Sequence, residues 1–411
     1  MHFFTVILEG LILSLLNPSL ASAKQGVKLL PKPSGPFPVA INTMELIDTS
    51  RLDPFAPTKT LRRIMISAVY PVKHNSPTCR YPYMPPLTAG IEDTEYSFPA
   101  GTYESLVLQV ACNSKPKDDA PLVIFSPAQG NTRLDYSLLV SNVASYGFTV
   151  IMLDHPYDAD IVEFPDGSYT TPAYFNTSTL LQTEAAAIAL IDVRVADTSF
   201  VLDQLANETV IHHLIPGREC ALDPSSVAMF GHSLGGATAA SAMVVDTRIK
   251  GGLNMDSAIF DSEKVLEVGI DRPFLIFGHT NNTRFYEGED EDIFSATTWL
   301  ALWSVLTGWK LELEFAESLH YTFSDFPSQF ETLGLKLNAT ELVILLSGGP
   351  EGFDKLDVEN AVPIAASLLE AKRGLDIVVT YVVAFLEFVL KRKKEGLLDE
   401  PSGRFPELTF V

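Results

Sequence analysis

The chain has 411 residues, of which 46% are hydrophobic and 19% are charged, and its formal net charge is −22. This composition excludes a low-complexity chain, and it supplies enough apolar material for one large core. The negative charge excludes a general nucleic-acid-binding role, because most of the surface would repel a polyanion. We therefore expect a globular protein without a nucleic-acid partner.

The N-terminus has the pattern of a secretory signal peptide. An apolar stretch, Phe3–Leu16, precedes a helix break at Asn17-Pro18, and Ala21–Ala23 offers a small-x-small cleavage site. We predict that residues 1–23 are removed and that residues 24–411 form a single extracellular domain. Sequons for N-glycosylation support this secreted location, and they begin at Asn176, Asn207, Asn281 and Asn338.

The cysteines suit an oxidising compartment. Of the three, Cys79 and Cys112 fall in the same N-terminal, loop-rich region, whereas Cys220 lies in a later loop. We predict a disulfide between Cys79 and Cys112. The sequence contains no Cys-x-x-Cys pair and no His/Cys cluster at metal-ligand spacing, so we expect no metal and no cofactor.

Apolar runs alternate with helical patterns along the chain. Pro121–Ser126 and Phe148–Leu153 are continuous apolar runs, and Leu138–Tyr146 between them has helical spacing. Strands that are apolar on both faces are typical of a parallel sheet covered by helices. Further elements are predicted as strands or helices at Leu61–Val72, Tyr103–Val110, Thr179–Ala206, Gly251–Met255, Pro273–Gly278 and Leu311–Ala316. This order predicts an α/β-hydrolase fold, with a mostly parallel central sheet flanked by helices.

The most informative stretch is Ser226–Ala240, in which an apolar run, a tight turn and a helix-forming segment place Ser233 at the bend. Gly231 and Gly235 stand two residues before and after the serine, where a side chain would collide as the strand turns into the helix. Such a turn exposes the hydroxyl and aims the backbone N–H of Leu234 at a developing oxyanion. We predict Ser233 as a nucleophile, and a glycine-rich turn without chemistry is the alternative.

A serine nucleophile needs a histidine as base, and eight histidines compete for that role. Only His320 follows the last predicted strand, where this fold places its base. We predict His320 as the base, and a polar loop residue is the alternative. The others lie in the signal, after earlier elements or beside the serine, and they are His2, His74, His155, His212, His213, His232 and His279.

The base in turn needs a carboxylate that orients it. The loop after Pro273–Gly278 is the usual place, but it offers no carboxylate before Glu287. Asp256 ends the preceding strand, one strand closer to Ser233, and we predict it as the acid. The alternative is that Asp256 caps the segment that follows it.

A second oxyanion donor is expected in the loop after Pro121–Ser126. The segment Pro127–Asn131 brings small residues close to the nucleophile, and by position the donor is the backbone N–H of Gln129. A simple turn explains Gly130 equally well.

Two apolar segments follow the predicted acid. Phe294–Trp309 carries Trp299 and Trp303 at near-helical spacing, and these side chains could line an acyl pocket or belong to ordinary core. Leu375–Leu390 is too short to span a bilayer, and we predict that it packs as a terminal helix.

Taken together, these motifs resemble the plasma-type (isoform II) platelet-activating factor acetylhydrolase family. The likeness runs from about Leu30 to the C-terminal helix and includes the early position of the acid. It is carried by Leu30–Phe37, Asp48–Phe55, Ser126–Gly130, Gly231–Thr238, Met255-Asp256 and His320–Phe326.

The resemblance implies a calcium-independent esterase that removes short or oxidised acyl groups from the sn-2 position of glycerophospholipids. It assigns the triad to Ser233, Asp256 and His320, and the oxyanion donors to Gln129 and Leu234. Two departures concern substrate preference. They are Pro127-Ala128 in place of a histidine-glycine pair, and the acidic stretch Glu287–Asp292.

Two other functions stay open. One is a general short-chain carboxylesterase or polyester hydrolase, and the other is a catalytically silent binding protein of the same fold. Silent relatives usually lack a triad member, whereas Ser233, Asp256 and His320 are all present. The expected partner is a small-molecule or lipid ester, with transient contact to a lipid surface and no obligate protein partner.

Overall fold

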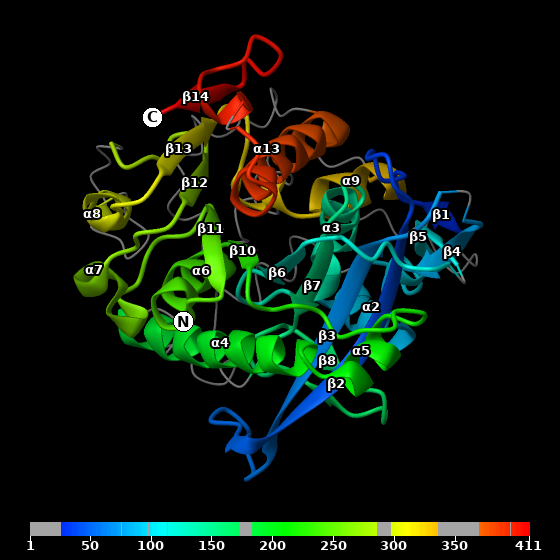
Figure 1. Cartoon of the computed structure of the whole chain (residues 1–411). Helices are drawn as coiled ribbons and strands as arrows, with labels where there is room; N and C mark the ends of the chain where they lie inside the picture. The colour runs from blue at the N-terminus through cyan, green and yellow to red at the C-terminus, as the bar shows by residue number, and fades with distance from the viewer. Residues whose placement is uncertain are drawn as a thin grey trace, which may run out of the picture.

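The computed structural model describes residues 26–74, 76–96, 98–112, 114–172, 183–285, 297–335, 370–394 and 396–411 (Figure 1). The predicted signal peptide, the sequons at Asn176 and Asn338, and the acidic stretch Glu287–Asp292 lie outside these residues. Within the described ranges, no helix combines the length and apolar character that a membrane crossing requires.

A nine-stranded sheet forms the centre of the molecule, in the order β14-β13-β12-β11-β10-β6-β7-β3-β2. The strands from β7 to β13 in this order pair in parallel, whereas β2, β3 and β14 pair antiparallel at the two edges. The predicted α/β-hydrolase architecture is therefore confirmed. The strands are β2 (Val39–Leu52), β3 (Leu61–Pro71), β6 (Leu122–Ser126), β7 (Thr149–Leu153), β10 (Val227–His232), β11 (Ile249–Met255), β12 (Phe274–His279), β13 (Lys310–Phe315) and β14 (Leu408–Phe410).

Helices cover both faces of this sheet, as its continuous apolar strands require. In β6, Val123 and Phe125 belong to one buried cluster, whereas Leu122 and Ile124 belong to another. The first cluster includes α3 (Ser137–Ala144) and α13 (Ala371–Lys391), and the second includes α4 (Glu184–Leu205) and α6 (Leu234–Val245). The remaining helices are α2 (Pro86–Glu95), α5 (Glu208–Leu214), α7 (Val265–Val268), α8 (Thr297–Val305) and α9 (Phe326–Leu333), with short 3₁₀ turns η2 (Tyr103–Ser105), η3 (Arg133–Tyr136), η4 (Ser262–Lys264), η5 (His320–Phe323) and η6 (Gly396–Leu398).

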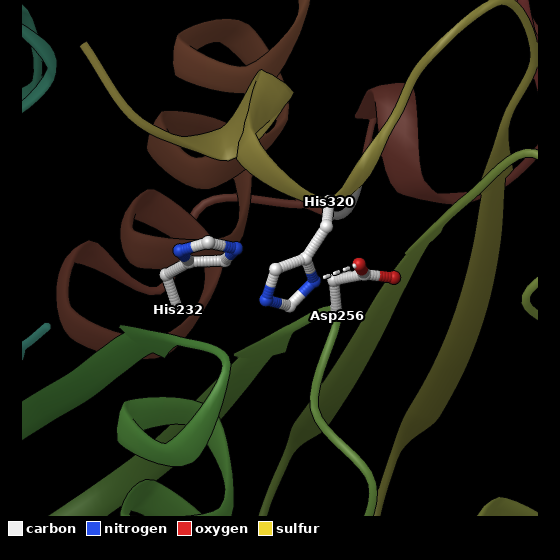
Figure 2. Close-up of side chains that lie close together, drawn as sticks. All are labelled: His232, Asp256 and His320. Atoms are coloured by element: carbon white, nitrogen blue, oxygen red, sulfur yellow. Dashed lines mark hydrogen bonds and ion pairs between the residues drawn. The ribbon is translucent and has the colours of Figure 1, made fainter. Parts of the chain in front are cut away.

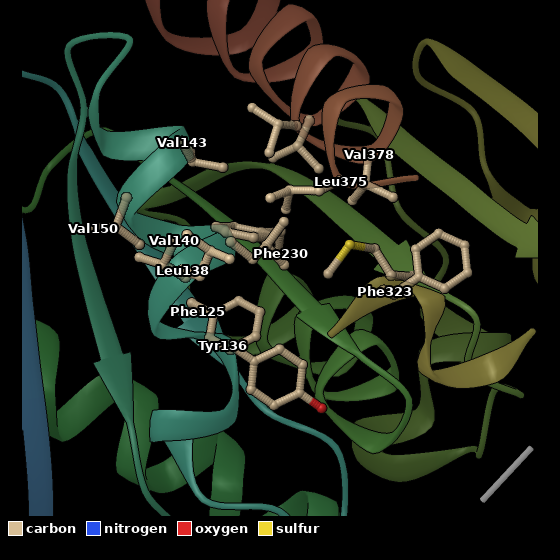
Figure 3. Close-up of a cluster of buried hydrophobic side chains, with 14 of the residues drawn as sticks. Phe125, Tyr136, Leu138, Val140, Val143, Val150, Phe230, Phe323, Leu375 and Val378 are labelled. Carbon is tan, nitrogen blue, oxygen red and sulfur yellow. The ribbon is translucent and has the colours of Figure 1, made fainter. Parts of the chain in front are cut away.

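The first cluster ties the terminal helix to the strands beneath the candidate site. Figure 3 shows Phe125 of β6 and Phe230 of β10 packed among side chains of α3 and α13, including Leu138 and Leu375. Both phenylalanines are fully buried. Truncating either to alanine should cost about 3–5 kcal/mol, since the surroundings cannot collapse fully into the void.

A smaller sheet lies apart from the main one, in the order β1-β5-β4. Its strands are β1 (Lys28–Leu29), β4 (Thr78–Pro82) and β5 (Leu106–Ala111), and a further hairpin pairs β8 (Val162–Glu163) with β9 (Tyr169–Thr170). The predicted strand at Tyr103–Val110 is thus displaced, because its first three residues form η2. The predicted Cys79–Cys112 disulfide is present and links β4 to the end of β5, and Cys220 is a free, exposed cysteine.

Candidate active site

Ser233 lies at the sharp turn between β10 and α6. Its backbone has φ 50° and ψ −130°, a conformation that a non-glycine residue seldom adopts. A Cβ at Gly231 would collide with the backbone of Gly235, and a Cβ at Gly235 would collide with the carbonyl of Ser126. Both glycines are therefore required for the turn, and they let the end of β6 approach the start of α6.

The neighbouring strand fastens this turn. The backbone N–H of Ser233 donates to the carbonyl of Met255, at 2.8 Å, and Met255 is the last residue of β11. Asp256 follows directly, with φ 63°, and its own N–H donates to Phe277 of β12 at 2.9 Å. Ser233 and Asp256 thus stand at the carboxyl ends of adjacent parallel strands, where open α/β sheets bind their ligands.

Asp256 and His320 are brought into direct contact. His320 begins η5 after β13, and its Nδ1 lies 2.6 Å from Oδ2 of Asp256. Figure 2 shows that the second ring nitrogen of His320 faces away from the carboxylate. A carboxylate only accepts hydrogen bonds, so Nδ1 carries the proton and Nε2 of the neutral ring is free to take one.

Three further groups hold the same carboxylate. His279, at the end of β12, contacts both oxygens of Asp256 through Nδ1 at 2.7 Å and donates its backbone N–H to Oδ1 at 3.0 Å. Asn282 donates its side-chain amide to Oδ1 at 2.7 Å. The sequence analysis considered His279 only as a candidate base. Its position at the end of β12, the strand beside β11, could have indicated a contact with Asp256.

The charges of this group support one another. Burial alone would raise the pKa of Asp256, but His279 and His320 outweigh burial and hold this pKa well below its ordinary value. Burial would also lower the pKa of His279, yet Asp256 and the more distant Glu314 raise it above its ordinary value. Asp256 is therefore a stable anion, and His279 beside it holds a proton more readily than a free imidazole does.

His232 connects the serine turn to the loop after β6. Its Nδ1 lies 2.8 Å from the hydroxyl of Tyr136, and that hydroxyl accepts the backbone N–H of Ala128 at 3.2 Å. Burial and the ring of His320, whose centroid is 4.5 Å away, hold the pKa of His232 well below its ordinary value. The neutral form of His232 is thus favoured, and its contact with Tyr136 gives it a positioning role in the turn.

The loop Pro127–Asn131 is held from below by Arg194 of α4. The guanidinium donates to the carbonyl of Pro127 at 2.6 Å and to that of Ala128 at 3.3 Å, and it pairs with both oxygens of Asp158 at 2.6 and 2.8 Å. Among the described residues, the backbone N–H groups of Gln129 and Leu234 have no hydrogen-bond partner. These two amides are therefore available to an oxyanion. The role of Arg194 in holding this loop was not predicted from the sequence.

A second Ser-His-Asp arrangement is closed to substrate. Ser126 Oγ lies 3.1 Å from Nε2 of His155, whose Nδ1 lies 3.0 Å from Asp197. All three residues are buried, and Arg62 pairs with Asp197 at 2.6 Å. This cluster belongs to the buried ionic network between β3, β7 and α4.

The two tryptophans proposed for an acyl pocket have different surroundings. Trp299 is 1% exposed, belongs to the core cluster of α4 and α6, and donates its Nε1 to the carbonyl of Ser257 at 2.5 Å. Trp303 is half-buried beneath Arg284 and Lys310, whose charged groups lie 4.0 and 4.6 Å from its ring. Core packing accounts for the contacts of Trp299, and the acyl-pocket role of both residues stays a prediction.

The remaining predicted positions lie on the surface. Asn207 is exposed and caps α5, where its Oδ1 accepts the N–H of Thr209. Asn281 is exposed, with φ 65°, in the turn after β12. Both side chains are accessible to a modifying enzyme.

Similarity searches place the chain among known esterases. Residues 97–170 and 215–337 match the family described as platelet-activating factor acetylhydrolase, isoform II. The chain is 31% identical to a "Probable 1-alkyl-2-acetylglycerophosphocholine esterase" of Arthroderma benhamiae over 436 aligned positions, covering 99% of this chain and all of that protein. It is 27% identical to the platelet-activating factor acetylhydrolase of Cavia porcellus over 46% of this chain and 49% of that protein.

A solved structure shares the architecture. The ferulic acid esterase of Streptomyces cinnamoneus superposes with a TM-score of 0.71 at 26% identity, over 93% of this chain and 99% of that one. Fold, site and relatives together define a carboxylic ester hydrolase of the α/β-hydrolase type. More narrowly, the chain belongs to the platelet-activating factor acetylhydrolase family, isoform II.

Proposed function

We propose that this chain is a secreted, calcium-independent serine esterase that hydrolyses short or oxidised sn-2 acyl esters of glycerophospholipids. The observation that carries this proposal is the 2.6 Å contact between His320 Nδ1 and Asp256, beside the Ser233 turn. The full-length similarity to a probable 1-alkyl-2-acetylglycerophosphocholine esterase supports the substrate class.

In the acylation step, Ser233 Oγ attacks the ester carbonyl while His320 Nε2 takes the hydroxyl proton. Asp256 stabilises the imidazolium that forms, and the amides of Gln129 and Leu234 bind the oxyanion. The bond between the carbonyl carbon and the sn-2 oxygen then breaks, and His320 returns the proton to the departing lysophospholipid. An acyl group remains on Ser233.

In the deacylation step, His320 takes a proton from water, and the hydroxide attacks the acyl carbonyl. The bond to Ser233 Oγ breaks, and the serine recovers its proton from His320. The products are the carboxylic acid and the free enzyme. Every proton passes through His320, so the chemistry needs no metal.

The substrate class is tested by measuring how fast the purified protein hydrolyses different esters. We expect rapid release of acetate from an sn-2 acetyl glycerophosphocholine, turnover that persists with a calcium chelator at temperatures well below unfolding, and poor cleavage of long sn-2 chains. A closed, short acyl pocket would explain this selectivity, because each methylene left unburied forfeits about 0.8 kcal/mol. Cleavage of p-nitrophenyl acetate without cleavage of any phospholipid would contradict the proposal.

A second candidate is an esterase for small non-lipid esters, which the similarity to the Streptomyces cinnamoneus ferulic acid esterase favours. The same comparison should therefore include methyl ferulate and an insoluble polyester. Turnover of either at a rate above that of the short-chain phospholipid would favour this candidate.

Secretion is supported by the N-terminal sequence pattern and by the Cys79–Cys112 disulfide, which is typical of oxidising compartments. Expression with the native N-terminus should release a protein into the medium that begins at Lys24. Retention of residues 1–23 on an intracellular product would contradict this part of the proposal.

A further inference from the structure

Three carboxylates from distant parts of the sequence meet below the loop that carries Gln129. They are Glu92 of α2, Asp135 of η3 and Asp160 in the segment after β7. One oxygen from each lies within 4.8 Å of the other two. The group contains no histidine or cysteine, so the spacing of those residues in the sequence could not predict it.

As carboxylate anions, Glu92, Asp135 and Asp160 need more positive charge and more donors than the described residues supply. Glu92 is 1% exposed, and among the described residues no N–H or hydroxyl group donates to its carboxylate oxygens; their hydrogen-bond neighbour is the carboxyl group of Asp160. Asp135 is fully buried, and its Oδ1 is likewise unpartnered, whereas its Oδ2 accepts from Asn131 at 3.1 Å. Burying such acceptors without a donor or a cation costs several kcal/mol.

The spacing suits one cation. Calcium binds six to eight oxygens at about 2.3–2.6 Å, so two oxygens on the same ion lie at most about 5 Å apart. The three carboxylate oxygens lie within 4.8 Å of one another, so all of them can bind the same ion. Carboxylates are hard oxygen ligands, which calcium binds in flexible geometry, whereas magnesium demands a near-ideal octahedron.

An adjoining cavity gives access. It has a volume of about 130 Å³, and Glu92, Asp160, Glu95 and Thr171 contribute to its lining. Asp160 is only partly buried, so the cluster is reached through the cavity. This space is large enough for an ion together with a few waters, each of which takes about 30 Å³ in the liquid.

The cluster is joined to the candidate active site by hydrogen bonds. Asn131 bridges Asp135 to the hydroxyl of Tyr321, which donates to Asn131 Oδ1 at 2.9 Å. The carbonyl of Asp135 also accepts the N–H of Asp325 at 2.9 Å. A cation at this place would fasten the Gln129 loop to the segment that carries His320.

We propose that Glu92, Asp135 and Asp160 form a calcium-binding site that stabilises the scaffold of the active site. The cation takes no part in the ester chemistry. In the proposed function, on which this point rests, His320 carries every proton transfer. Chelation therefore lowers stability without abolishing turnover at temperatures well below unfolding.

The site is tested by calcium binding to the full-length mature protein after treatment with a chelator and desalting. We expect one bound Ca²⁺ by titration calorimetry, and a midpoint of thermal unfolding that rises with Ca²⁺ concentration. Glu92→Gln and Asp135→Asn should each weaken binding at least tenfold. Glu104→Gln, an exposed carboxylate on the adjacent η2, should bind as the wild type does.

Two results would overturn the proposal. One is the absence of both binding heat and thermal shift in the wild type up to about 10 mM Ca²⁺, which would mean that the carboxyls share protons instead. The other is wild-type binding by a folded Glu92→Gln variant. Neither measurement uses a substrate, so failure of the proposed esterase function would leave this test intact.

Discussion

His279 Nδ1 lies 2.7 Å from both carboxylate oxygens of Asp256, so one carboxylate serves two imidazoles. The second imidazole is His320, at 2.6 Å from Oδ2. A triad needs only one of these contacts. We infer that His279 is a positioning residue, which holds Asp256 ionised and correctly oriented for His320.

The first prediction is that His279→Asn lowers kcat by roughly 10- to 100-fold, because Asp256 loses a charged hydrogen bond of about 1.5–3 kcal/mol. The acid limb of the kcat/KM profile should also move to higher pH, since a positive neighbour of the base is removed. Steady-state kinetics across a pH series measures both effects. His213→Asn, on the exposed end of α5, is the control. Wild-type kcat with an unmoved profile would show that His279 serves only the fold.

The second prediction concerns the pH dependence of stability. The pKa of His279 is raised in the folded state, so its stabilisation is complete below about pH 6.5 and is lost as the pH rises through the folded pKa. The pKa of Asp256 is lowered, so its stabilisation is present above about pH 3.9 and is lost as the pH falls through the folded pKa. The free energy of unfolding of the wild type should exceed that of His279→Asn most between about pH 4 and 6.5. Urea unfolding checks this, and a difference that grows above pH 7 would contradict it.

Much of this arrangement could be predicted from the sequence, and the reasons are local. Continuous apolar runs predicted β6, β7 and β12, and the glycines around Ser233 permit the tight turn that its place between a strand and a helix requires. Asp256 and His320 could be predicted because each directly follows a predicted strand whose place in the order of strands along the chain is clear. The edge strand β2 was missed because few of its residues are fully buried, so it lacks a continuous apolar run, and because it carries charges such as Glu45 and Asp48.

Contacts between distant segments could not be predicted in this way. Arg194 meets the carbonyl of Pro127 across 67 residues, and Glu92 meets Asp135 and Asp160 only after α2 has packed. Neither contact leaves a periodic pattern, because each depends on where a helix docks. The same holds for His279 and Asp256, which are 23 residues apart on neighbouring strands.

The third prediction tests whether Ser233 or Ser126 is the nucleophile. A fluorophosphonate probe should label Ser233 and leave Ser126 unmodified, because Ser126 is fully buried. Ser233→Ala should lower kcat by several orders of magnitude, since only substrate binding and the oxyanion amides remain. Ser126→Ala should keep both labelling and most of the activity. Peptide mapping that finds label on Ser126 would overturn the assignment of the nucleophile.

The fourth prediction tests the acid. Asp256→Asn should fold but lower kcat by about 10⁴, the size of the effect in serine proteases, because the amide leaves His320 in the wrong tautomer. Glu287→Gln is the matched control from the later loop. Near-normal activity of Asp256→Asn together with inactivity of Glu287→Gln would move the acid to the loop after β12.

The fifth prediction concerns the loop that offers the Gln129 amide. Arg194 binds two carbonyls of this loop and both oxygens of Asp158, and lysine cannot reproduce that planar fork. Arg194→Lys should lower kcat by roughly 100-fold with little change in KM, the pattern expected when an oxyanion donor is misplaced.

Arg248→Lys is the matched control, because Arg248 also grips a carboxylate, that of Asp246, with two nitrogens at 2.9 and 2.6 Å. Arg248 lies just before β11, at the amino end of the strand whose carboxyl end precedes Asp256. Its substitution should therefore change stability without changing kcat in the folded enzyme. Thermal unfolding identifies the folded fraction of each variant, and kcat is corrected for it. If Arg194→Lys and Arg248→Lys then show equal kcat, Arg194 stabilises the fold without positioning the oxyanion loop.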